Sequence, residues 1–115
     1  MHVLLILNAG AAAFAAIFSI VAAFRPRIVP PHQDDRGPFL YAYAGRAVGL
    51  SVLAIPVLLH GATPVAALAA LALGLGQAGD IAAFLRVGDR RMATGASVGT
   101  LMHLASAVII AVAIT

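Results

Sequence analysis

The sequence predicts an all-α integral membrane protein, a single domain (residues 1–115) folded as an antiparallel four-helix bundle. The first observation is composition: 63% of the residues are hydrophobic and 10% are charged, whereas soluble domains carry about 25% charged residues. The second is that the hydrophobic residues gather in four runs of about 20 residues, the length that crosses a bilayer as a helix. The runs cover residues 3–24, 39–60, 65–85 and 92–115.

The first run, residues 3–24, could be a signal peptide or a retained span. No positive charge precedes it, and Arg25 and Arg27 follow it directly, which favours a retained span. Its polar residues, Asn8 and Ser19, are expected to hydrogen-bond to neighbouring backbone.

Residues 25–38 form the first predicted loop, because four prolines and a glycine exclude a regular helix there. His32, Asp34 and Asp35 lie close together in this loop and could suggest a metal site. Two adjacent aspartates and one histidine lack a defined ligand geometry, so we expect a solvated turn beside the membrane and no metal.

The second run carries aromatic residues near its start, where Tyr41 and Tyr43 suit an interfacial belt. By helical spacing, Tyr43 shares a face with Arg46. Pro56 is expected to kink this helix, and His60 to end it.

The third and fourth runs carry small residues at helical spacing. In the third, small residues recur every four positions, and such a stripe lets another helix approach closely. The stripe comprises Ala66, Ala70, Gly74, Ala78 and Ala82. G-x-x-x-G motifs, which have the same effect, occur at residues 45–49 and 95–99. Thr100, His103 and Ser106 then form a polar stripe in the fourth run.

Arginine placement predicts the topology. Six of the seven arginines lie in the loops 25–38 and 86–91, and none lies in the turn 61–64. The positive-inside rule therefore predicts a multi-pass protein of the cell inner membrane, with those two loops in the cytoplasm and both termini outside. Asn8 would then lie in the outer leaflet, and we do not expect it to join the polar residues of the other runs.

Arg46, Asp80 and His103 place ionisable groups inside three of the runs. A charge at the bilayer centre costs about 2.5–3.5 kcal/mol on insertion scales, so Arg46 needs a partner. Counted from the cytoplasmic ends at about 1.5 Å per residue, Arg46 lies about 10 Å deep and Asp80 about 9 Å deep, with His103 near the midplane. These depths predict one cavity that opens toward the cytoplasm, with Tyr43 and Gln77 beside it.

Two interpretations of these residues remain open. In the first they are catalytic: Asp80 orients His103 or carries a proton, and His103, with an ordinary pKa of about 6.5, is a general acid or base. Arg46 then holds an anionic group or an oxyanion, and Tyr43 and Gln77 bind the substrate. In the second, Arg46 and Asp80 are a structural ion pair. His103 is then an interior histidine bonded to its own polar stripe or to a facing carbonyl.

Several kinds of site are excluded. The chain has no cysteine, and so no disulfide, thiol nucleophile or cysteine metal site. It has no nucleotide-binding motif, and His103 is the one histidine in the interior of a run, so we expect neither haem, flavin nor another cofactor. The pI of about 10.7 could suggest nucleic acid, but the arginines flank apolar runs as topology signals, so no nucleic-acid partner is expected.

From Tyr41 to the C-terminus the chain resembles a family of small four-span bacterial membrane proteins of unknown function. The resemblance rests on Tyr43-Ala44-Gly45-Arg46-Ala47-Val48-Gly49, Ala78-Gly79-Asp80 and Met102-His103-Leu104. Many members carry an acidic residue after the arginine, where this chain has Ala47. The resemblance implies four spans and no established activity. Small multidrug transporters share this length but depend on a carboxylate in the first span and usually a pocket tryptophan, both of which this chain lacks.

The leading hypothesis is that the intramembrane Arg46, Asp80 and His103 site binds a lipophilic small molecule from the bilayer and performs acid–base catalysis: isomerisation, cyclisation or hydration. The alternative is a small proton-coupled transporter, a homodimer with Asp80 or His103 as proton site. The second alternative is a non-catalytic membrane subunit, with the small-residue stripe of the third run as its docking face.

Overall fold

The computed structural model of the chain describes residues 1–24 and 37–115. It contains helices α1 (His2–Phe24), α2 (Gly37–His60), α3 (Pro64–Arg86) and α4 (Arg90–Ala113), and no strand lies within the described ranges. All four helices are long and apolar enough to cross a membrane, which confirms the predicted all-α, four-span fold. The predicted loop residues up to Arg36, with His32, Asp34 and Asp35, lie outside the described residues.

Local signals fix the ends of the last two helices. The Thr63 side chain accepts a hydrogen bond from the backbone N–H of Ala66 at 3.0 Å, so it caps α3. Asp89 caps α4 in the same way, with its Oδ1 3.1 Å from the backbone nitrogen of Met92. Gly88, between α3 and α4, has a φ of +75°, a left-handed conformation that glycine adopts without strain.

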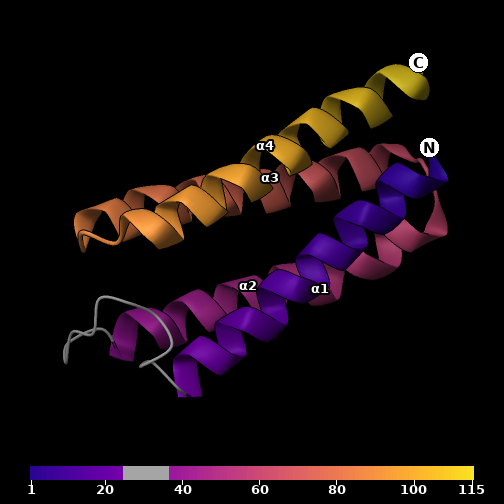
Figure 1. Ribbon diagram of the computed structural model, residues 1–115. Coiled ribbons are helices and arrows are strands. Elements are labelled where there is room, and N and C mark those ends of the chain that lie inside the picture. The colour runs from indigo at the N-terminus through magenta and orange to yellow at the C-terminus, as the bar shows by residue number, and fades with distance from the viewer. Residues whose placement is uncertain (25–36) are drawn as a thin grey trace.

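The helices form two antiparallel pairs. α1 lies along α2 and α3 lies along α4, whereas α1 and α4 make few contacts with each other (Figure 1). The pairs converge at the end that holds both termini and diverge toward the end that holds the α3–α4 turn (Figure 1). The main hydrophobic core lies at the converging end, where Leu5, Leu58, Ala66 and Ile110 are fully buried. The predicted antiparallel bundle is therefore confirmed, but it is splayed at one end.

Small residues bring α3 against α4. Ala66, Ala70 and Gly74 are buried, and a Cβ added to Gly74 would lie 2.6 Å from Leu104 Cδ2. Most of the predicted stripe is thus used within the chain, which leaves little of it as a docking face for a partner. Gly45 and Gly49 are exposed instead, and a Cβ added to either would meet nothing within 4 Å.

Other local predictions have mixed outcomes. Ser19 Oγ donates to the Ala16 carbonyl at 2.7 Å, as predicted, and α2 ends at His60, also as predicted. Pro56 lies inside α2, which continues through it. Tyr41 is exposed and packs edge-to-face on Phe24, with ring centroids 6.3 Å apart.

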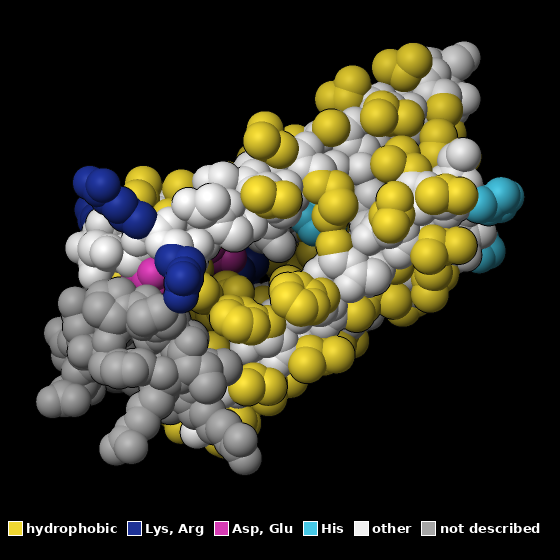
Figure 2. Space-filling view, in the orientation of Figure 1, with side chains coloured by type: hydrophobic (Ala, Val, Ile, Leu, Met, Phe, Trp, Pro, Cys, Tyr) yellow, Lys and Arg dark blue, Asp and Glu magenta, His cyan; other side chains and the backbone are white. Residues whose placement is uncertain are grey.

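The charged side chains gather at the diverging end. Arg86, Arg90 and Arg91 are exposed there, whereas hydrophobic side chains are spread over the other described parts of the face that Figure 2 shows. This separation is what the topology prediction requires, and the orientation of the termini stays a prediction.

Candidate functional site

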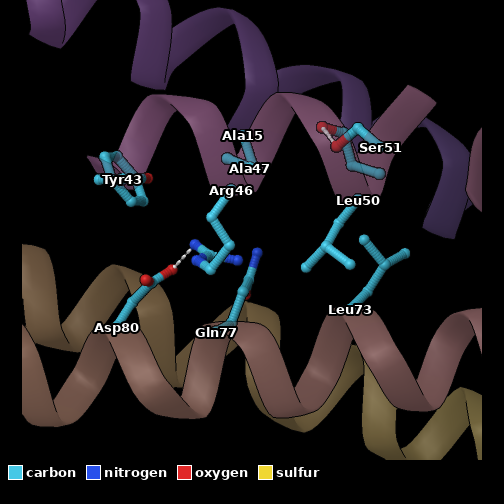
Figure 3. Close-up of a pocket in the computed structure, with 10 residues that line it drawn as sticks. Ala15, Tyr43, Arg46, Ala47, Leu50, Ser51, Leu73, Gln77 and Asp80 are labelled. Atoms are coloured by element: carbon cyan, nitrogen blue, oxygen red, sulfur yellow. Dashed lines mark hydrogen bonds and ion pairs between the residues drawn. The ribbon is translucent and has the colours of Figure 1, made fainter. Parts of the chain in front are cut away.

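An ion pair joins α2 to α3. Arg46 extends from α2 toward α3, where its Nη2 donates to Asp80 Oδ2 (Figure 3). The Asp80 side chain is 10% exposed and that of Arg46 is 32% exposed, so the pair lies mostly within the bundle. The prediction that Asp80 partners Arg46 is confirmed.

Two neighbours hold the Arg46 guanidinium in place. The Tyr43 ring lies beside it, with its centroid 5.7 Å from Arg46 Cζ. On α3, Gly76 leaves room for it, because a Cβ there would lie 2.7 Å from Arg46 Nη1. Tyr43 also packs edge-on against Phe84, with ring centroids 5.4 Å apart. Tyr43 therefore faces the bundle, on the side of Arg46, as the helical spacing predicts.

Gln77 lies one turn from Asp80 on α3 and packs against Gly99 of α4, whose missing side chain makes the space. Its Oε1 is buried and has no hydrogen-bond partner among the described residues. The space enclosed between Arg46, Gln77 and Ser51 is only about 10 Å³ (Figure 3), enough for one water molecule at most. The space beside the Arg46 guanidinium is therefore too small for a substrate.

A larger cleft of about 410 Å³ lies on the other side of Asp80, between α1 and α4. Phe14 and Phe18 line it from α1, Gln77 and Asp80 from α3, and residues 91–102 from α4. Figure 2 shows a hollow on this face in which acidic and basic side chains are visible. The volume falls within the range of about 300–1,000 Å³ that is typical of small-molecule sites.

The cleft is open along its side. Phe14 on α1 is 70% exposed and Val98 on α4 is 67% exposed, and both belong to its lining. Asp80 and Gln77 can therefore be reached between these two helices.

His103 belongs to a different polar cluster. Its Nδ1 lies 2.7 Å from Asn8 Oδ1, and Asn8 Nδ2 donates to Ser106 Oγ at 2.7 Å and to the Leu4 carbonyl at 2.8 Å. Asn8 bonds to neighbouring backbone, the Leu4 carbonyl of its own helix, as predicted. The prediction that it stands apart from the other polar residues is wrong. The prediction that His103 shares a cavity with Arg46 and Asp80 is wrong. The hydrogen-bond partner of its ring is Asn8 rather than Asp80.

The hydrogen bonds of Asn8 determine the state of the His103 ring. Because Asn8 Nδ2 makes both donations, its Oδ1 must accept, so His103 Nδ1 carries the hydrogen. Neutral His103 then presents a lone pair at Nε2. That nitrogen is buried and has no partner in the part of the chain that the structure describes.

The Asn8–His103 hydrogen bond closes the deep end of the cleft. On α1 the lining begins at Ala11, about one turn from Asn8, and on α4 it ends at Met102, next to His103. The two helices therefore touch at this bond and separate beyond it, toward the arginine-rich end.

Sequence reasoning missed the cleft and the residues Phe14, Phe18 and Arg91 that line it. Phe14 and Phe18 are one turn apart in an apolar run, which is indistinguishable from a lipid-facing stripe. Arg91 was interpreted only as a topology signal. No group of three potential metal ligands occurs among the described residues.

Comparisons with protein families, with curated proteins and with solved structures find no match to this chain.

Proposed function

We propose that this four-span membrane protein binds a lipophilic small molecule, which enters the α1–α4 cleft from the bilayer. The observation that carries the proposal is the cleft of about 410 Å³, whose apolar wall also presents Asp80 and Gln77. Ligand sites commonly combine a mostly apolar lining with a few fixed polar groups.

The ion pair makes the polar wall rigid. Arg46, which does not line the cleft, bonds to Asp80, and the Gln77 side chain packs against Gly99. Pre-positioned polar groups in a water-poor site recognise a ligand group without reorganising. The predicted role of Tyr43 and Gln77 in substrate binding is part of this proposal, since both line the cleft.

Acid–base catalysis is the reaction class we propose for this site: isomerisation, cyclisation or hydration. Asp80 is the group we assign to proton transfer, because it lines the cleft. Arg46 does not line the cleft, so in this proposal it acts through its bond to Asp80, whose carboxylate it holds in position. His103 is fully buried next to Met102 and does not line the cleft, so the proposal assigns it no contact with the ligand.

Filling the cleft tests the proposal. Gly95 lines the cleft, and a Cβ there would meet nothing within 4 Å, so Gly95→Leu occupies the space without a backbone clash. We expect a lipophile that co-purifies with the wild-type protein at about one per chain to be lost from this variant, as measured by mass spectrometry of organic extracts.

Gly10→Leu is the matched control. Gly10 is exposed on α1, outside the cleft lining, and its Cβ position is also open. The control should retain the lipophile. Equal amounts of lipophile in both variants would refute a ligand site in the cleft.

A proton-coupled transporter is the second candidate function, favoured by Asp80, a carboxylate in the membrane interior that lines the cleft. We propose a homodimer for this function, since four short spans leave little room for a pathway. Proteoliposomes should show uptake driven by a pH gradient, and Asp80→Asn should abolish the coupling. Unchanged coupling in that variant would exclude Asp80 as the proton site.

A further inference from the structure

We infer that the ligand is an amphiphile with an anionic headgroup, and that Arg91 binds this headgroup at the mouth of the cleft. The inference rests on the proposed ligand site and adds the chemical class of its ligand.

The charged residues that line the cleft indicate the charge of the ligand. Asp80 and Arg91 are the charged residues that line it within the described ranges. Asp80 already bonds to Arg46, so its charge is compensated inside the bundle. Asp89, two residues from Arg91, is buried and caps α4 through the Met92 N–H. Among the described residues, the positive charge of Arg91 therefore determines the net sign of the cleft lining, and it favours an anion.

The positions of the lining residues indicate which part of the cleft holds the headgroup and which part holds the chain. Arg91 stands in the first turn of α4, and Met102 stands eleven residues further on, or about 16 Å along the helix at about 1.5 Å per residue. Between these ends the α4 side of the cleft is apolar or small, and Phe14 and Phe18 face it from α1. A charged mouth above an apolar body accepts an amphiphile in one orientation, with its chain pointing toward His103.

The competing explanation is that Arg91 only anchors α4 at the membrane surface. That explanation makes Arg90 and Arg91 equivalent, since both are exposed at the start of α4. Only Arg91 lines the cleft, so the two arginines form a matched pair for a test.

The experiment measures binding to the full chain in phosphatidylcholine nanodiscs. Radiolabelled lauryl phosphate and lauryl alcohol are the probes, and the proteins are wild type, Arg91→Gln, Arg90→Gln and Gly95→Leu. We expect Arg91→Gln to weaken lauryl phosphate binding about tenfold, the lower end for a hydrogen bond to a charged group, and to leave lauryl alcohol binding unchanged. Arg90→Gln should alter neither, Gly95→Leu should abolish both, and inorganic phosphate should not compete.

Equal losses in Arg91→Gln and Arg90→Gln would overturn the inference, as would tighter wild-type binding of lauryl trimethylammonium than of lauryl phosphate. Competition by inorganic phosphate would also overturn it, because the site would then recognise a free anion. In each of these cases the proposed function survives if lauryl alcohol binding is lost in Gly95→Leu. If neither probe shows binding that depends on Gly95, the proposed function fails together with the inference.

Discussion

Arg46 and Asp80 neutralise each other inside an apolar bundle, and this compensation is their contribution to stability. Removing one partner leaves the other as an uncompensated charge, which is more costly than removing both. Arg46 is one-third exposed, so water and headgroups reduce that cost.

A double-mutant cycle tests this pairing. We expect Arg46→Ala and Asp80→Ala each to lower the free energy of unfolding, and the double variant to lose less than the sum. The coupling energy should lie in the range of about 0.5–3 kcal/mol found for contacting residues. Unfolding in mixed detergent micelles measures it, and additive losses would show that the two side chains do not interact.

The Asn8–His103 contact should couple α1 to α4 more weakly, because both groups are neutral. A cycle of Asn8→Ala and His103→Ala should give about 0.6 kcal/mol, the average for hydrogen bonds in membrane proteins, and at most about 1.7 kcal/mol. The same unfolding assay applies. Thr94→Ala is the control, since the one hydrogen bond of the Thr94 side chain to a described residue is to the Arg90 carbonyl of its own helix. A cycle of Thr94→Ala with His103→Ala should show no coupling.

At the scale of helices, the two glycines of the 95–99 motif have different surroundings. Both glycines line the cleft, but a Cβ at Gly99 would collide with the Gln77 side chain, whereas a Cβ at Gly95 would meet nothing within 4 Å. One position of the motif therefore serves helix packing, and the other faces open space.

Alanine at each position separates these roles. Gly99→Ala should lower the free energy of unfolding by about 1 kcal/mol, the low end for overpacking, because its Cβ displaces only the flexible end of the Gln77 side chain. Gly95→Ala should be neutral or should stabilise α4 by up to about 1 kcal/mol through helix propensity. Equal effects of the two substitutions would contradict the difference in packing.

Connectivity explains which contacts could be predicted from the sequence. Arg46 and Asp80 lie on helices joined by a short turn, which fixes their relative height, so counting residues from the helix ends finds the pair. Asn8 and His103 lie on α1 and α4, which no turn joins. Their relative height depends on how the two pairs tilt, and residue counts do not contain that information.

At the scale of the whole molecule, the two helix pairs are joined by a hydrophobic core at one end and separated at the other. The core around Leu58 and Ile110 and the Asn8–His103 bond hold the terminal end together. The cleft follows from this asymmetry. Apolar periodicity predicts that four helices pack, but it does not predict where the packing stops.

The topology prediction can be checked directly, because the chain contains no cysteine. We expect Thr115→Cys and Ala62→Cys to react with a membrane-impermeant maleimide in intact cells. Val87→Cys, in the α3–α4 turn, should react only after the membrane is permeabilised. The reverse pattern would place the arginine-rich end outside.

The central claim is that the α1–α4 cleft holds a ligand, and an experimental structure in a lipid bilayer tests it most directly. We predict an elongated non-protein density between Phe14 and Met102, with its polar end at Arg91. A closed interface, with α1 packed on α4 along residues 91–102 and no space beside Asp80, would contradict the claim.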